Sequence, residues 1–343
     1  MLTRENFTKS HIDELRMKSK RDPVLLERAV YAFGLLEAIS RIGLPFIFKG
    51  GTCLMLLLQR PMRLSADIDI LVEPGTDLDA YVQKSSVIFP FVRCEEQKRV
   101  GNSGIEKRHF QFTYDSPTNG KELYILLDVL FEENPYAHLL EKEISNELLL
   151  TQGEMLTVKV PNVNGILADK LTAFAPHTTG IPLNVGKDME VMKQMYDVCT
   201  LIDAFTDFAE VRDTYMRISK TEIAYRGTDI KPDDALMDTF QAAACIASRG
   251  KMDGEYKLYV GGIRDLRGHI FAENYSPEIA AVRVTKIMYA AACLRHDAIY
   301  ERVANAAAFA DKVPIHEHYL PLRYLRKVNP EAYAYVIKAD KLM

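Results

Sequence analysis

Asp67 and Asp69 stand two positions apart in an apolar run that the pattern predicts to be a β-strand. Alternate side chains of a strand share a face, so both carboxylates lie together while Ile68 and Ile70 point into the core. Adjacent carboxylates repel each other unless a cation lies between them, and Mg²⁺ prefers such oxygen ligands together with phosphate oxygens and water. The pair therefore predicts a magnesium site that acts on a phosphate-bearing substrate.

A short turn, Gly50-Gly51-Thr52, lies between the strand-like run 46–48 and a helix-like run that begins at Cys53. Glycines let the backbone approach a phosphate closely, and a helix start presents unpaired N–H groups and a positive dipole end. Taken singly, a Gly-Gly-Thr sequence is more often only a turn, and a pair of strand acids is more often only a solvated strand end. Linked in one segment, they predict a site for a metal-bound triphosphate.

A third acid, Asp128, interrupts the strand-like run 123–131. The run is otherwise too apolar to bury a charge without a partner, so Asp128 is predicted to join the first two acids. The alternative is that its side chain lies on the open face of a sheet.

These residues resemble a known family, the AbiEii/AbiGii-type nucleotidyltransferases of bacterial abortive-infection and toxin–antitoxin systems. The similarity covers roughly residues 20 to 205 and rests on four motifs: Lys49-Gly50-Gly51-Thr52, Arg63-x-Ser65-x-Asp67-Ile68-Asp69, the Asp128 strand and Lys193-x-x-x-Asp197. It implies a nucleotidyltransferase domain followed by a mostly helical domain. Members use a magnesium-bound nucleoside triphosphate, and some transfer nucleotides to the acceptor ends of transfer RNA. An antitoxin protein is the partner that such a system implies.

The resemblance also implies roles for single residues. Asp67 and Asp69 hold the metals, and Asp128 completes the triad as a metal ligand or as the base toward the attacking hydroxyl. The implied catalytic set is Asp67, Asp69, Asp128 and Lys193. The implied nucleotide-binding set is Gly50, Gly51, Thr52, Ser65, Lys170, Lys193 and Asp197.

Lys193 and Asp197 are separated by four positions, so on a helix they share a face. Asp197 is predicted to orient the Lys193 ammonium toward the triphosphate. A surface salt bridge explains the same spacing equally well. Lys170 is a second phosphate candidate, although a solvated helix face explains its position too.

Two alternating runs, 91–100 and 106–115, are predicted to form a hairpin. Its basic residues Arg93, Lys98, Arg99, Lys107 and Arg108 lie near Phe110, Phe112 and Tyr114, which suits a nucleic-acid backbone and stacked bases. Three glutamates in the same runs offset this charge, so we favour a solvated hairpin.

Two further patterns are interpreted as structural. His316-Glu317-His318 lacks a nearby third ligand and does not predict zinc. Gly261-Gly262 is predicted to be a turn, because no phosphate-loop pattern follows it.

Composition sets the broader expectations. The chain has 343 residues, 48% hydrophobic and 26% charged, as in a soluble protein of about two domains. A formal net charge of −4 excludes a strongly cationic nucleic-acid coat. Five scattered cysteines are predicted to be core thiols. No apolar run is long enough to cross a bilayer, and the polar N-terminus has no signal-peptide core, so a cytoplasmic protein without membrane contact is expected.

The elements that position these residues alternate up to about residue 205. A helix over 22–41, with Asp22 as its cap and Pro23 at its first position, precedes the glycine turn. Thr76 is predicted to cap a helix that continues to Phe89. From residue 206 the pattern is almost entirely helical. The predicted fold is α+β: a nucleotidyltransferase-like mixed β-sheet flanked by helices in a catalytic domain, 1–205, followed by a mostly α-helical C-terminal domain, 206–343.

The resulting hypothesis is a nucleotidyltransferase that moves an NMP from an NTP to an acceptor hydroxyl with two Mg²⁺ ions. The acceptor is expected to be an RNA (tRNA) end, with the protein acting as a toxin or abortive-infection component. Two alternatives stay open at this point. One is a small-molecule nucleotidyltransferase, and the other is a non-catalytic nucleotide-binding module that acts through its helical domain.

Overall fold

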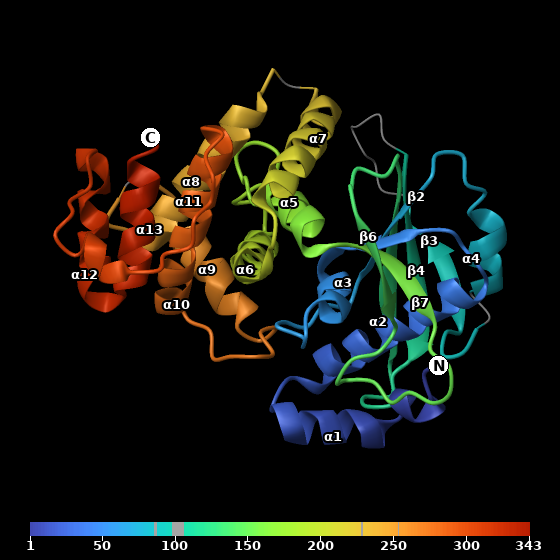
Figure 1. Ribbon diagram of the computed structural model, residues 1–343. Coiled ribbons are helices and arrows are strands. Elements are labelled where there is room, and N and C mark those ends of the chain that lie inside the picture. Colours follow the sequence, from blue (N-terminus) through green and yellow to red (C-terminus); the bar gives the residue numbers. More distant parts are fainter. Residues whose placement is uncertain (86–87, 98–105, 228, 253) are drawn as a thin grey trace. The chain divides into compact units, whose positions relative to one another are not determined.

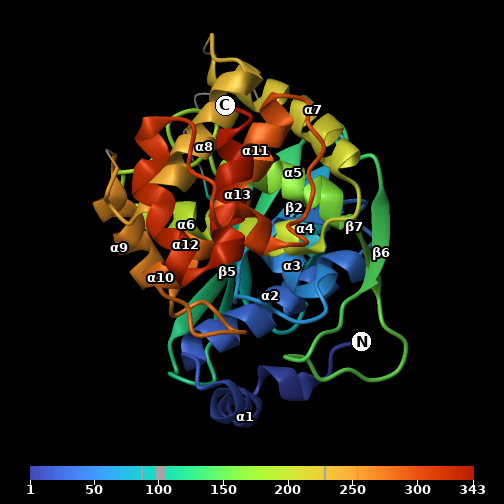
Figure 2. The ribbon, with the colours of Figure 1, turned by 60° about the vertical axis from the view of Figure 1, so that its left-hand side comes forward.

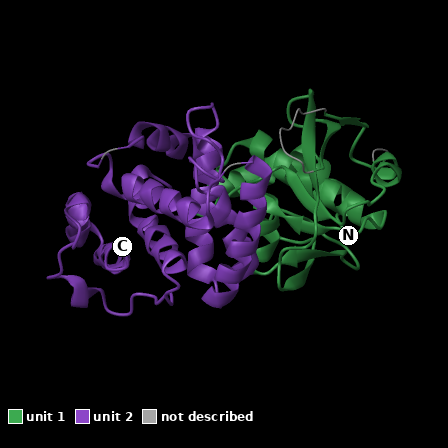
Figure 3. Ribbon diagram, turned by 90° about the horizontal axis from the view of Figure 1, so that it is seen from above, with its two compact units in different colours: residues 1–162, 268–273 green, residues 163–267, 274–343 purple. Residues whose placement is uncertain are grey.

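The computed structural model describes the chain except residues 86–87, 98–105, 228 and 253. The chain divides into two compact units, drawn in two colours in Figure 3. The first unit contains residues 1–162 and 268–273, and the second contains 163–267 and 274–343.

The division between the units falls earlier than the predicted boundary after residue 205. Helices α5 (Val163–Ala173) and α6 (Asp188–Ala204) belong to the second unit, where α5 packs on α7 (Phe208–Arg226) and α6 packs on α9 (Tyr256–Leu266). Alternation of strands and helices indicated the chain order but not these tertiary contacts.

A mixed sheet forms the centre of the first unit, as predicted. Within the described residues it has seven strands in the order β3-β4-β5-β2-β1-β7-β6. Figure 1 shows the sheet beside α2, and Figure 2 shows β6 at one edge. Pairs β1–β7 and β2–β5 are parallel, and the other neighbours are antiparallel. The strand bounds are Ile47–Lys49 (β1), Ile68–Val72 (β2), Arg93–Glu96 (β3), Lys107–Asp115 (β4), Glu122–Phe131 (β5), Leu139–Glu143 (β6) and Thr157–Pro161 (β7).

Helix α2 packs against β2 and β5 and covers one face of this sheet. It starts as predicted, because Asp22 accepts hydrogen bonds from the first backbone N–H groups and Pro23 follows. The ring of Tyr31 in α2 stacks on that of Tyr114 in β4, with 3.7 Å between the centroids. Helices of the first unit are η1 (Arg4–Phe7), α1 (Lys9–Ser19), α2 (Pro23–Arg41), α3 (Gly50–Leu57) and α4 (Asp79–Ser85).

The two faces of the central strands differ in polarity. Ile68, Ile70, Leu127 and Val129 are almost fully buried on the face that α2 covers. Asp69 and Asp128 occupy the alternate positions of these two strands, so their side chains lie on the opposite face of the sheet. Local alternation thus fixes the face on which the chemistry lies.

Residues 268–273 return from the helical part of the chain to the first unit. The backbone N–H of Leu64 donates to the carbonyl of His269 at 2.7 Å, and that of Phe271 donates to Met62 at 2.9 Å. Arg63 and Ile270 form an isolated antiparallel bridge. The returning segment therefore fixes the backbone of residues 62–64, which precede Asp67 and Asp69 in the sequence.

The second unit is helical, which confirms the predicted C-terminal architecture. Helix α11 packs on α8 and α13, and α5 packs on α6 and α7. None of the helices in the described part of the chain is both long and apolar enough to span a bilayer. The remaining bounds are α8 (Pro232–Ser248), α10 (Pro277–Arg283), α11 (Thr285–Arg295), η2 (Ala306–Phe309), η3 (Glu317–Tyr324), α12 (Leu325–Val328) and α13 (Pro330–Asp340).

Two local predictions are wrong. Gly261 and Gly262 are not in a turn but inside α9, where a Cβ on Gly262 would lie 2.4 Å from the carbonyl oxygen of Asp188. The glycine therefore allows close packing against the start of α6. Thr76 does not cap a helix either, because its hydroxyl donates to the carbonyl of Glu73 and α4 begins three positions later, at Asp79.

Candidate active site

One row of side chains crosses four neighbouring strands on the open face of the sheet. Lys49 lies directly opposite Asp69, Asp69 lies opposite Asp128, and Asp128 lies opposite His109. Directly opposed residues of paired strands have side chains on the same face, about 5 Å apart. Residues far apart in the sequence thus form a Lys–Asp–Asp–His row.

Gly50 starts α3 beside this row. Its φ is +80°, and a Cβ built on it would lie 1.9 Å from Oδ2 of Asp69. Glycine is therefore required for two reasons, because an L side chain disfavours this φ and because the Asp69 carboxylate fills the space. The predicted approach of a phosphate to this glycine stays a prediction, and in the structure the Asp69 carboxylate fills the space that a Cβ would take.

Gly51 has a similar neighbourhood. A Cβ on it would lie 2.4 Å from a guanidinium nitrogen of Arg63 and 2.9 Å from the hydroxyl oxygen of Ser65. Arg63 is only 5% exposed, so its charge lies in the protein interior at the start of α3. Arg63 belongs to the sequence motif of the strand acids, but the sequence predicted no role for it, because its burial depends on the returning segment.

Thr52 is fully buried, and its hydroxyl donates to the carbonyl of Asp67 at 2.6 Å. This hydrogen bond fixes the backbone at the first acid. The predicted role of Thr52 in cradling a phosphate stays a prediction, and in the structure its hydroxyl makes a positioning contact within the protein.

Asp67 immediately precedes β2, and its Oδ1 lies 3.7 Å from a guanidinium nitrogen of Arg28 in α2. The Arg28 guanidinium also lies over the ring of Tyr124, 5.6 Å from the centroid. Arg28 therefore provides positive charge next to the first acid, which sequence reasoning missed because Arg28 lies far away in the chain.

His109 and Asp128 form a close pair, with 2.6 Å between Nδ1 and Oδ1. Both side chains are partly buried, at 17% and 31% exposure. Sequence reasoning did not single out His109. The hairpin pattern placed it on the same strand face as Gln111, but only the register of β4 on β5 places it opposite Asp128.

The other predicted site residues lie in the second unit. Lys170 in α5 pairs with Asp197 in α6, with 3.2 Å between the charged atoms and 8% and 2% side-chain exposure. The Lys170 ammonium also donates to Gln194 at 2.9 Å. Lys193 lies 3.6 Å from Glu190 on its own helix. Lys170 is thus not on a solvated helix face, and the orientation of Lys193 by Asp197 stays a prediction.

The predicted hairpin exists as β3 and β4, although its Lys98 and Arg99 lie outside the described residues. Arg108 contacts Glu96 and Asp79 at 2.8 and 2.6 Å, and the hydrogen bond to Glu96 is the main cause that raises the Arg108 pKa. Phe110, Phe112 and Tyr114 are buried in the core, so they are not available for stacking on bases. These contacts favour the solvated-hairpin interpretation.

Within the described residues, no group of three His, Cys, Asp or Glu side chains is arranged to hold a metal ion. His316 pairs with buried Asp340, with 2.8 Å between Nδ1 and Oδ1. The donors of the acidic row still suit Mg²⁺, because this ion is usually held by one or two carboxylates and takes its other ligands from phosphates and water. Asp69 and Asp128, opposed on parallel strands, provide such a pair.

Comparison with known proteins gave one family. The model described as "Nucleotidyl transferase AbiEii toxin, Type IV TA system" matches residues 34–266, more than half of the chain. A search of curated protein sequences found no match.

Solved structures show weaker similarity. JHP933 from Helicobacter pylori is 13% identical over 79% of this chain and 93% of its own, with a TM-score of 0.43. A second H. pylori protein is 13% identical over 79% of this chain and 96% of its own, with a TM-score of 0.45. An antigenic nucleotidyltransferase-like protein from Paracoccidioides brasiliensis is 14% identical over 57% of this chain and 87% of its own, with a TM-score of 0.38.

Proposed function

The chain belongs to the AbiEii nucleotidyltransferase toxin family, and on that premise we propose that it transfers an NMP from an NTP to a hydroxyl at an RNA end. The observation that carries this proposal is the row of Lys49, Asp69 and Asp128 beside the start of α3. Two opposed carboxylates next to a helix start suit a metal-bound polyphosphate better than a neutral ligand.

Asp69 and Asp128, together with Asp67, are the residues that would hold two Mg²⁺ ions. When bound, these ions supply activation of the attacking hydroxyl and neutralise charge on the leaving pyrophosphate. Fixing the carboxylates beforehand matters for this chemistry, because preorganised groups do not have to reorient during the reaction. Gly50 leaves room for Asp69, Thr52 holds the backbone of Asp67, and His109 holds Asp128.

The triphosphate would bind at the start of α3, where backbone N–H groups and the Arg63 guanidinium supply positive character. The sequence alone is the basis for proposing Lys193 and Lys170 as phosphate contacts. The buried Asp197 holds the ammonium of Lys170 at 3.2 Å and thereby limits its rotamers. Each lysine would bind a phosphate as a charged donor.

The family description supports the proposed partner, whereas the acceptor is proposed from the resemblance in the sequence. Because that description names a type IV toxin–antitoxin system, we propose that the chain is a toxin controlled by an antitoxin protein. An RNA acceptor is proposed over a small molecule because the resemblance implies it, since some members of the family transfer nucleotides to the ends of transfer RNA. Its contacts are to be sought away from the hairpin, where Arg93 and Arg108 are already paired with acids.

The test is to incubate the purified chain with each of the four labelled ribonucleoside triphosphates, Mg²⁺ and total cellular RNA. The proposal expects label in an RNA band for at least one triphosphate, and none when EDTA is added. Label recovered only in small molecules would support the small-molecule alternative. No transfer from any triphosphate would refute the proposed activity.

A further inference from the structure

A pocket of about 390 Å³ opens one side-chain row away from the acids. Its lining includes Ile47, Leu71 and Lys159, which are cross-strand neighbours on β1, β2 and β7. Ile47 precedes Lys49 by two positions, and Leu71 follows Asp69 by two positions. Side chains two positions apart on a strand share a face and lie roughly 7 Å apart. The pocket row therefore continues the face that carries the acidic row.

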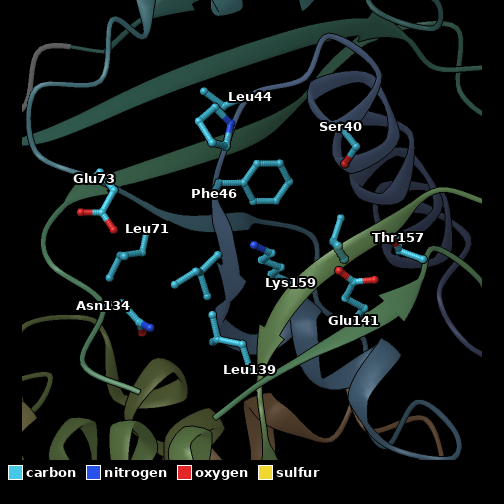
Figure 4. Close-up of a pocket in the computed structure, with 13 residues that line it drawn as sticks. Ser40, Leu44, Phe46, Leu71, Glu73, Asn134, Leu139, Glu141, Thr157 and Lys159 are labelled. Carbon is cyan, nitrogen blue, oxygen red and sulfur yellow. The ribbon is translucent and has the colours of Figure 1, made fainter. Parts of the chain in front are cut away.

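The pocket combines an apolar floor with a charged rim. Ile47 and Leu71 are buried at 8% and 2% exposure, and the Phe46 ring adds a flat apolar surface. Glu73 lies on one side in Figure 4, and Glu141 lies on the other.

The rim charges are open to a ligand. The side chains of Glu73, Glu141 and Lys159 are exposed. Lys159 lies opposite Glu141 on the next strand. Even so, among the described residues none of these three side chains forms an ion pair or hydrogen bond. Two carboxylates against one ammonium disfavour a phosphate here, and charged groups disfavour a purely apolar ligand. The rim suits a ligand that offers hydrogen-bond donors around a flat ring.

We propose that this pocket binds a nucleobase that carries an exocyclic amino group. The floor takes the ring, and the carboxylate on one side of the rim, that of Glu73 or that of Glu141, accepts a hydrogen bond from the amine, as acids do when they read cytosine. The volume lies within the range of small-molecule sites. This inference rests on the proposed function, since the base is either that of the incoming triphosphate or that at the RNA end.

Direct binding tests the pocket without any turnover. Cytidine and uridine have nearly the same size, but at C4 cytidine has an amine and uridine a carbonyl. We expect the full-length chain to bind cytidine about tenfold more tightly, as measured by calorimetry or NMR titration. One of the two variants Glu73→Gln and Glu141→Gln should bring this ratio toward one and thereby identify the acid that binds the amine, because a glutamine amide can also donate to the uridine carbonyl.

Glu143→Gln is the matched control, because Glu143 is an exposed acid on the same face of β6 but does not line the pocket. It should keep the full preference for cytidine. Equal binding of the two nucleosides, no binding at millimolar concentration, or an unchanged preference in both pocket variants would overturn the proposal.

Transfer assays then identify the source of the base. In one arm, kcat/KM is compared for CTP and UTP with one RNA. In the other, oligoribonucleotides ending in cytidine or uridine are compared with one triphosphate. The base belongs to the substrate whose arm prefers cytidine in the native chain and loses this preference in the glutamine variant that lost it in the binding experiment. Equal rates in both arms contradict the pocket's role. Absence of any transfer refutes the proposed function instead, and nucleoside binding still decides the pocket.

Discussion

Gly50 and Asp69 lie so close that a Cβ atom on Gly50 would stand 1.9 Å from Oδ2 of Asp69. The helix start and the strand acid are thus fitted to each other within one segment of the chain. Any side chain at position 50 must displace the carboxylate, the helix or both.

Gly50→Ala should therefore abolish nucleotide transfer and lower the free energy of unfolding. The matched control is Gly43→Ala, because Gly43 has a φ of +78° but no atom within 4 Å of the position that its Cβ would take. The control should cost only about 1–2 kcal/mol, the penalty of a left-handed backbone, and should keep activity. Urea denaturation and the transfer assay measure both effects. An active Gly50→Ala, no less stable than Gly43→Ala, would contradict the described fit.

His109→Leu should lower turnover about ten- to hundredfold, as is typical when a partner of a metal-binding group is lost. The Michaelis constant for the triphosphate should change little, because His109 contacts Asp128 rather than the phosphates in this account. Gln111→Leu changes the same face of the same strand two positions away and serves as the control. Equal turnover in the two variants would show that the histidine contact has no role in catalysis.

Lys170 and Asp197 form a buried pair, so removing one partner leaves an uncompensated charge. Asp197→Leu should cost about 3–5 kcal/mol of stability, and the double variant with Lys170→Met should recover much of that cost. Chemical denaturation measures this cycle. Activity should not recover in the double variant if Lys170 binds phosphate. Recovery of both stability and activity would assign the pair a purely structural role.

His177 predicts a pH dependence in the helical unit. Burial opposes its protonation, but hydrogen bonds to Asp238 and Glu255 outweigh this effect and raise its pKa above the ordinary 6.5. A raised folded-state pKa gives stability that is fully present below the unfolded value and is lost as pH rises through the folded value. His177→Gln should therefore destabilise the chain at pH 6 more than at pH 8, as followed by thermal unfolding. An equal loss of stability at pH 6 and at pH 8 would contradict the described ion pairs of His177.

Local sequence patterns predicted several elements. Asp22 and Pro23 start α2 as expected, the hairpin strands pair, and Asp69 and Asp128 lie in β-strands as the pattern indicated. These features depend on short-range rules, namely caps, turns and the two-residue period of a strand.

Features that depend on long-range contacts were missed. The role of His109 requires the register of β4 on β5, and the burial of Arg63 requires a segment that returns from beyond residue 267. The local sequence around Gly262 suggests a turn, yet a glycine is needed there because a side chain would collide with the backbone of α6. The paired state of Lys170 likewise depends on a neighbouring helix, which is why a solvated face was an equal alternative.

The central claim is that Asp69 and Asp128 hold the magnesium that supports nucleotidyl transfer, and Asp69→Asn tests it most directly. The substitution keeps the size of the side chain and removes its charge. Transfer of labelled nucleotide to RNA should fall at least about a hundredfold at saturating triphosphate, while the metal-free chain should stay as stable as the native one or become more stable, because two opposed like charges are relieved. Mg²⁺ with triphosphate should raise the melting temperature of the native chain but not that of the variant. Native turnover and native magnesium stabilisation in Asp69→Asn would contradict the account.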